Sequence, residues 1–115
     1  MSQALDTFGQ IVVGARDSAF GQFDRTLSGQ AKAPSRRELS AKLASLGEDE
    51  RKLVRWAVRE AVDTALHDLL FALYADDRVL LAFEQVDLKD TSDGFQGDYV
   101  TEEGWVGRFS KYPAA

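Results

Sequence analysis

The chain of 115 residues contains no cysteine. A disulfide framework, a thiolate zinc site and a cysteine nucleophile are therefore excluded. Long apolar runs are absent too, since Ile11, Val12 and Val13 fall far short of the roughly 20 residues that a membrane-spanning helix needs. The first residues show no basic segment leading into an apolar core, so we expect no secretory signal and a cytoplasmic protein.

The composition, 44% hydrophobic and 29% charged, is typical of one soluble globular domain with a single core, spanning residues 1–115. The net charge of −5 is unevenly distributed. Residues 1–75 carry ten acidic and ten basic side chains, whereas residues 76–103 carry nine acidic and two basic ones. This asymmetry predicts an acidic surface, which disfavours nucleic acid and anionic membrane as partners and favours a basic protein.

One long helix is predicted over residues 48–77, because its apolar residues recur every three or four positions. Its main apolar stripe consists of Val54, Val58, Ala61, Val62, Ala65, Leu66, Leu69 and Leu73. The opposite side carries a second apolar set at its two ends, namely Leu53, Trp56, Phe71 and Tyr74. A helix that is apolar on two faces is usually buried from two sides, so we expect it at the centre of the domain.

Between those ends lie Glu60, Asp63 and His67, whose i, i+3, i+7 spacing aligns them along about two helical turns. His67 is the only histidine and can titrate near neutral pH. A hydrogen-bonded structural network is the commonest role for such residues. The alternatives are a metal site, which would need a further ligand, and general acid–base catalysis, which would need a substrate pocket.

Two further helices are predicted before the long one, over residues 3–27 and 35–46. The first has an apolar stripe formed by Leu5, Phe8, Val12, Ala15, Ala19, Phe23 and Leu27. The second begins with a capping box of Ser35 and Glu38, and Gly47 is placed to end it.

After residue 77 the apolar period changes from 3.6 to 2. The alternation predicts strands over residues 78–88, 95–101 and 105–112, separated by the turn signals Asp93-Gly94 and Glu103-Gly104. The expected fold class is therefore α+β, with three helices followed by a three-stranded antiparallel meander packed on the long third helix.

The stretch between His67 and Tyr112 resembles short bacterial proteins of unknown function, which implies no activity. The residues that carry this likeness are His67-Asp68, Ser92-Asp93-Gly94, Glu103-Gly104-Trp105 and Phe109-Ser110-Lys111-Tyr112. In size and acidity the chain is also similar to toxin-immunity proteins.

The leading functional hypothesis is a non-enzymatic protein-binding module, such as an immunity or antitoxin-type protein that neutralises a basic partner. Its expected contact surface comprises Asp87, Asp90, Asp93, Asp98, Tyr99, Glu102, Glu103 and Trp105, with the two aromatic residues as anchors. The alternative is a small enzyme or metal-binding protein built on Glu60, Asp63 and His67. A third hypothesis is a homodimer that buries Trp56, Phe71 and Tyr74. No cofactor is expected.

Overall fold

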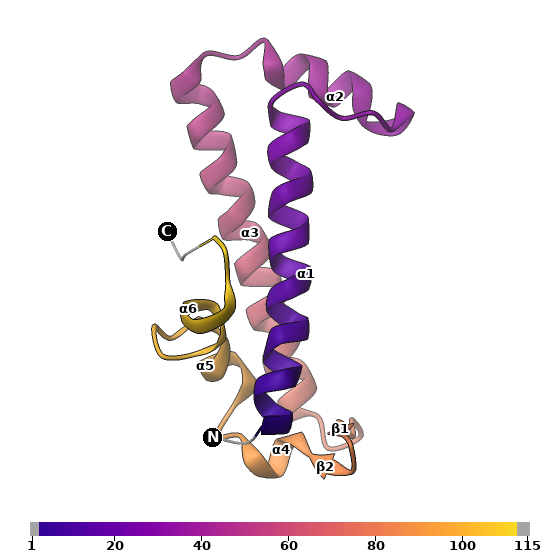
Figure 1. Ribbon diagram of the computed structural model, residues 1–115, viewed down its shortest axis with the longest axis vertical. Coiled ribbons are helices and arrows are strands. Elements are labelled where there is room, and N and C mark those ends of the chain that lie inside the picture. Colours follow the sequence, from indigo (N-terminus) through magenta and orange to yellow (C-terminus); the bar gives the residue numbers. More distant parts are fainter. Residues whose placement is uncertain (1–2, 113–115) are drawn as a thin grey trace.

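Two long antiparallel helices form the body of the protein in the computed structural model, which describes residues 3–112. They are α1 (Gln3–Leu27) and α3 (Glu48–Ala75), and the shorter α2 (Pro34–Ala44) lies across the end where they are connected (Figure 1). Ser40, which is 2% exposed, ties α2 to α1 by donating a 2.7 Å hydrogen bond to the Thr26 carbonyl. The molecule is elongated, with dimensions of 49 × 28 × 21 Å.

The C-terminal third consists of short elements packed against the other end of this helical hairpin. They are β1 (Ala82–Phe83), β2 (Val86–Asp87), α4 (Leu88–Thr91), α5 (Phe95–Val100) and α6 (Trp105–Phe109). The two strands pair antiparallel, with Ala82 opposite Asp87 and Phe83 opposite Val86. Positive φ angles at the two residues between them, 49° and 69°, give the tight primed turn that closes a two-residue hairpin.

The expected three-stranded meander is wrong, and the described chain is mainly helical. Residues 78–88 form a loop and the small β1–β2 hairpin, whereas 95–101 and 105–112 contain the helices α5 and α6. Short segments fit two periods at once, because Phe95 and Tyr99, like Trp105 and Phe109, are also spaced i, i+4. In the folded chain each pair packs into the core from one side of a helical turn, and this packing selects a helix over a strand.

Several predicted helix boundaries also change. Helix α3 ends at Ala75, two residues earlier than expected. Helix α2 begins at Pro34 with Ala33 as its N-cap, so the predicted capping box does not form, and Gly47 is the N-cap of α3. Proline at the first helical position needs no backbone N–H partner, which explains why the helix starts there.

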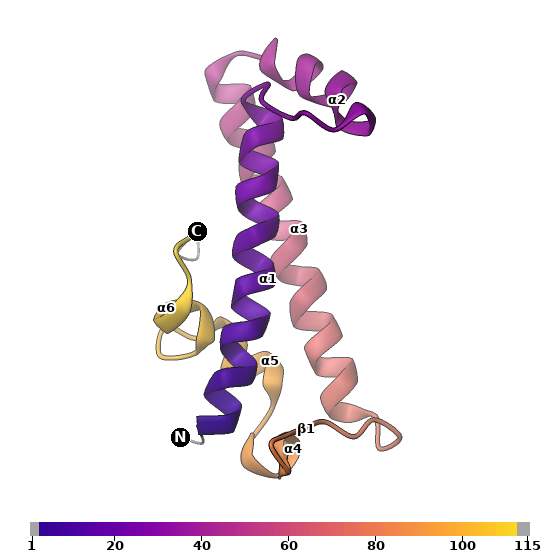
Figure 2. The ribbon, with the colours of Figure 1, turned by 45° about the vertical axis from the view of Figure 1, so that its right-hand side comes forward.

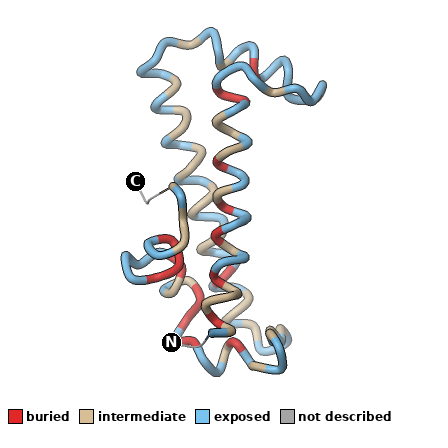
Figure 3. The backbone as a smooth tube through the Cα atoms, viewed as in Figure 1, coloured by how far each residue is buried: buried red, intermediate tan, exposed pale blue. Residues whose placement is uncertain are grey.

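The hydrophobic core lies where α1 meets the C-terminal third, and not around α3 (Figure 3). The indole of Trp105, which is fully buried, packs directly on Gly9 and against the rings of Phe8 and Phe95, and the Tyr74 ring packs on Phe95. Leu70 is the one buried residue of α3, so the expectation that this helix is buried from two sides is wrong. Within residues 3–112, none of the helices combines the length and apolar character needed to cross a bilayer.

Candidate functional site

A buried arginine is the centre of the most developed polar site. Arg16 lies in the middle of α1 and is 1% exposed, on the side of the helix that also presents Val13 and Phe20 to the interior. Its guanidinium carbon lies 4.5 Å from the centre of the Phe20 ring, a cation–π contact. A buried charge is stable only when it is paired and hydrogen-bonded, so its partners define the site.

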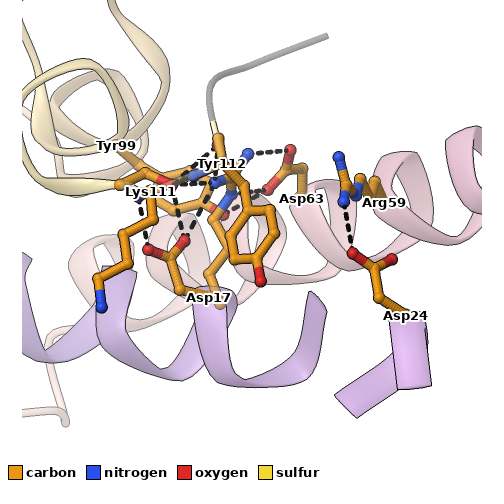
Figure 4. Close-up of polar contacts among 9 residues, drawn as sticks. Asp17, Asp24, Arg59, Asp63, Tyr99, Lys111 and Tyr112 are labelled. Carbon is orange, nitrogen blue, oxygen red and sulfur yellow. Dashed lines mark hydrogen bonds and ion pairs between the residues drawn. The ribbon is translucent and has the colours of Figure 1, made fainter. Parts of the chain in front are cut away.

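The main partner is Asp63 of α3, which holds the guanidinium through two hydrogen bonds. Arg16 Nε donates to Asp63 Oδ1 at 2.6 Å, and Nη2 donates to Oδ2 at 3.1 Å. The Tyr99 hydroxyl of α5 donates to the same Oδ1 at 2.6 Å (Figure 4). This bidentate geometry is the strongest form of an arginine–carboxylate pair, and it joins three helices at one point.

The remaining side of the guanidinium binds the C-terminal segment. Arg16 Nη1 donates to Ser110 Oγ at 2.7 Å and to the Tyr112 carbonyl at 2.6 Å. Asp17, the next residue of α1, accepts from Ser110 Oγ at 2.6 Å and from the Lys111 backbone N–H at 2.8 Å. The last described residues are therefore fastened to α1 by a pair of adjacent charged side chains.

The electrostatics of the site shift the pKa values of Arg16 and Tyr99. Burial lowers the pKa of Arg16, but the hydrogen bonds and negative charge of Asp63 outweigh it, so the pKa is raised overall. Burial raises the pKa of Tyr99 well above its usual value, and the hydrogen bond to Asp63 raises it further, while the charge of Arg16 opposes this. Tyr99 therefore stays a neutral hydrogen-bond donor.

A second cationic contact lies one turn further along the hairpin. Arg59 of α3 places its guanidinium carbon 5.2 Å from the Phe20 ring centre and 5.0 Å from that of Tyr112. Its Nη2 donates to Asp24 at 3.1 Å, and Arg55 donates to the other oxygen of the same carboxylate at 3.3 Å. Arg55 and Arg59 thus hold α3 against α1 through a shared carboxylate.

These contacts give Asp63 a structural role. Glu60, Asp63 and His67, which were predicted to lie together, have different surroundings in the structure. Asp63 accepts three hydrogen bonds from Arg16 and Tyr99, whereas Glu60 is exposed and His67 Nδ1 lies 3.1 Å from the Asp68 carboxylate. Among the residues that the structure describes, no group of three His, Cys, Asp or Glu side chains could hold a metal ion. Glu60, Asp63 and His67 are thus not gathered into such a group in the described part of the chain, and the alternative built on them stays a prediction.

Only some residues of the predicted contact surface are exposed. Asp87, Asp90, Asp93, Glu102 and Glu103 are exposed, while Asp98 is partly buried and accepts a 2.5 Å hydrogen bond from Ser92 Oγ. Tyr99 and Trp105 are both 0% exposed, so their expected role as interface anchors is wrong for this structure. Both belong to the core because their large rings fill the space between α1, α3 and the C-terminal third.

The predicted dimer surface of Trp56, Phe71 and Tyr74 does not form one exposed face. Trp56 and Phe71 are 59% and 47% exposed, but Tyr74 turns inward. Its hydroxyl donates to the Ser92 carbonyl at 2.8 Å and its ring packs edge-on against Phe95.

A hollow of about 750 Å³ runs between α1 and the C-terminal segment, and its lining includes Gly14, Ser18, Gly21, Phe109 and Tyr112. The carboxylate of Asp17, which also lines it, is engaged by Ser110 and Lys111.

Sequence reasoning missed Arg16, although a signal for it was present. Arg16 follows Val13 by three residues and precedes Phe20 by four, so it occupies a position on an apolar helical stripe. The middle of the stripe predicted for α1, Phe8, Val12, Ala15 and Ala19, was displaced by one position from the residues that are buried, Gly9, Val13, Arg16 and Phe20, while Leu5 and Leu27 were placed correctly. A charged residue in a buried stripe points to an opposite charge elsewhere in the chain.

Comparison with known proteins adds no identification: no protein-family model, no curated protein and no solved structure gives a significant match to this chain.

Proposed function

We propose that this chain is a small, non-enzymatic protein-binding module of the cytoplasm that uses its acidic end to recognise a basic protein. The observation that carries the proposal is the state of four acidic side chains, Asp90, Asp93, Glu102 and Glu103. All four are exposed, and no basic side chain within residues 3–112 forms an ion pair with them.

The position of this charge supports the same proposal. Residues 76–93, with six acidic and two basic side chains, lie at the end of the molecule opposite α2, and α5 and the acidic loop after it lie beside the helical hairpin (Figure 1). Charge gathered at one end of an elongated molecule attracts an oppositely charged surface and raises the rate of encounter. Because like charges repel, the same end disfavours nucleic acid and anionic membranes.

The specific form that we propose is an immunity or antitoxin-type protein that neutralises a basic toxin. Its support is the combination of small size and an acidic, exposed surface, which suits tight association with a cationic active site or binding face.

The test is capture of partners from the native host by the tagged protein at low and high salt, followed by measured association rates. Reversing Asp90, Glu102 and Glu103 to lysine should slow association with a basic partner at least tenfold at low salt and far less at high salt. Asp98 is left intact because it bonds to Ser92. An unchanged rate would contradict the proposal.

The matched control reverses three exposed acids at the other end of the molecule, Glu38, Glu48 and Asp49. It changes the net charge by the same amount but leaves the acidic end intact. The proposal requires that this control retain most of the wild-type association rate.

A further inference from the structure

The side of the helical hairpin that faces away from α5 and α6 is uncovered. Figures 1 and 2 show the C-terminal elements on one side of α1 and α3, while the other side is bare between α2 and the β1–β2 hairpin. This bare face is the surface on which the inference rests.

Helix α3 contributes an apolar stripe to the bare face that the rest of the chain leaves largely open. It consists of Val54, Val58, Ala61, Val62, Ala65, Leu69 and Leu73. At 3.6 residues per turn these positions fall within an arc of about 120°, centred more than about 100° from Asp63 and Tyr74, which contact the C-terminal third. None of the seven is buried, and Leu69 is 52% exposed.

Helix α1 contributes a second uncharged stripe beside it. Ile11, Ala15 and Ala19 are exposed on the side of α1 that faces away from the bound C-terminal segment, and Ile11 is 58% exposed. The small alanine side chains on both helices would allow another helix to approach closely. Two neighbouring apolar stripes on antiparallel helices are half of a four-helix bundle.

The size of the bare face matches that of a stable dimer interface. Helix α1 has 25 residues and is therefore about 37 Å long, and two helices side by side are about 20 Å wide. The face thus measures roughly 700 Å² per chain, or about 1,400 Å² in a pair, within the usual range of about 1,200–2,000 Å². The radius of gyration, 16.6 Å, exceeds the roughly 13 Å of a compact chain of this length, because the face is not covered from within.

The charge distribution selects a second copy of the same chain in antiparallel orientation. Residues 22–59, at the end that carries α2, have nine basic and five acidic side chains, whereas residues 76–93 at the other end have six acidic and two basic ones. Two copies placed head to tail bring the basic end of each against the acidic end of the other. A parallel pair would place like charges together.

We propose that this protein forms a two-fold symmetric dimer in which the bare faces pack antiparallel, α3 against α3 and α1 against α1. The two-fold axis passes close to Ala61 and Ala65, midway along the α3 stripe. In this arrangement Arg51, at the start of the stripe, lies near Asp77 of the second copy, since both are 13 residues from residue 64. The acidic loop between α5 and α6 lies on the far side of the hairpin, so the dimer does not depend on the proposed function.

The first test is the mass in solution, by light scattering or sedimentation, over a range of concentrations. The wild type should show twice the 12.7 kDa of one chain. Leu69→Glu should raise the dimer dissociation constant at least 100-fold and give the mass of one chain, with unchanged helical circular dichroism because Leu69 is half exposed. The matched control is Leu53→Glu, at a residue of the same helix that is 60% exposed and lies about 140° around α3 from the centre of the stripe, which should leave the dimer intact.

Orientation is tested by charge exchange. Arg51→Glu and Asp77→Arg should each weaken the dimer, and the two together should restore it. Because the chain has no cysteine, a single spin label at residue 52 reports on one site per chain. The antiparallel pair predicts labels roughly 40 Å apart, since residue 52 lies about 20 Å along the helix from its middle.

A wild-type mass of one chain at all concentrations, or a dimer unaffected by Leu69→Glu, would overturn the proposal. A short distance between the labels would overturn the antiparallel arrangement. The same holds if the combined Arg51→Glu and Asp77→Arg variant does not restore the dimer.

Discussion

The contact between Arg16 and Asp63 makes a quantitative prediction about stability. We consider Asp63→Asn, which removes the negative charge while keeping the shape of the side chain. The Arg16 side chain is 1% exposed and would retain one acceptor oxygen of the asparagine, together with Ser110, the Tyr112 carbonyl and a 3.5 Å contact with Asp17. The substitution therefore leaves a buried positive charge without its principal partner.

Breaking a buried pair by removing one partner costs about 3–5 kcal/mol. Here the cost is reduced because the Asp63 side chain is 27% exposed, so water can reach one side of the pair, and because asparagine keeps one acceptor oxygen. We expect a loss of about 2–3 kcal/mol in the free energy of unfolding. That is a large part of the roughly 5–15 kcal/mol that stabilises a domain.

The assay is urea denaturation followed by circular dichroism, at one fixed chain concentration so that self-association does not change the comparison. Asp68→Asn is the matched control, because the Asp68 side chain is 73% exposed and lies on the same helix, five residues further on. It should change the free energy of unfolding by less than about 0.5 kcal/mol.

Combining Asp63→Asn with Arg16→Met tests the reasoning more directly. The double variant removes both charges of the Arg16–Asp63 pair, so its destabilisation should be smaller than the sum of the two single effects. If Asp63→Asn costs less than about 1 kcal/mol, or if the two effects add, the buried pair does not stabilise the fold in the way described here.

Three further outcomes follow from the core and the charged groups. A Cβ at Gly9 would overlap the buried indole, so Gly9→Ala should destabilise the fold by about 1–3 kcal/mol in thermal melts, whereas Gly14→Ala, with open space around it, should be neutral or stabilising by up to about 1 kcal/mol. The pKa of Tyr99 is raised by burial, so its contribution to stability is complete below pH 10, its ordinary pKa, and is lost as pH rises through the higher folded value. Denaturation curves above pH 10 should therefore show a loss that Tyr99→Phe abolishes, and an equal loss in both proteins would contradict this. The hydrogen bond from Arg108 lowers the pKa of Asp6, so this contact stabilises the fold above pH 3.8 and is lost as pH falls through the lower folded value. Asp6→Asn should remove that acid-dependent part of the unfolding curve, and an unaltered acid transition would count against the contact.

The sequence by itself determined the long helices, because each spans enough turns for its period to be unambiguous. The third helix was predicted over residues 48–77 and runs from Glu48 to Ala75, and the first was placed correctly at 3–27. The concentration of acidic residues after residue 75 was equally visible, since charge is a property of composition. These features depend on local spacing alone.

The tertiary structure alone decided the short elements and the polar site. Phe95 and Tyr99 satisfy both a strand and a helical spacing over so few residues, and only packing against α1 and α3 selects the helix. The partners of Arg16 come from residues 47 to 96 positions away, a separation on which sequence periodicity carries no information. For the same reason, the sequence showed that the stripe on α3 is apolar but not that the chain leaves it uncovered.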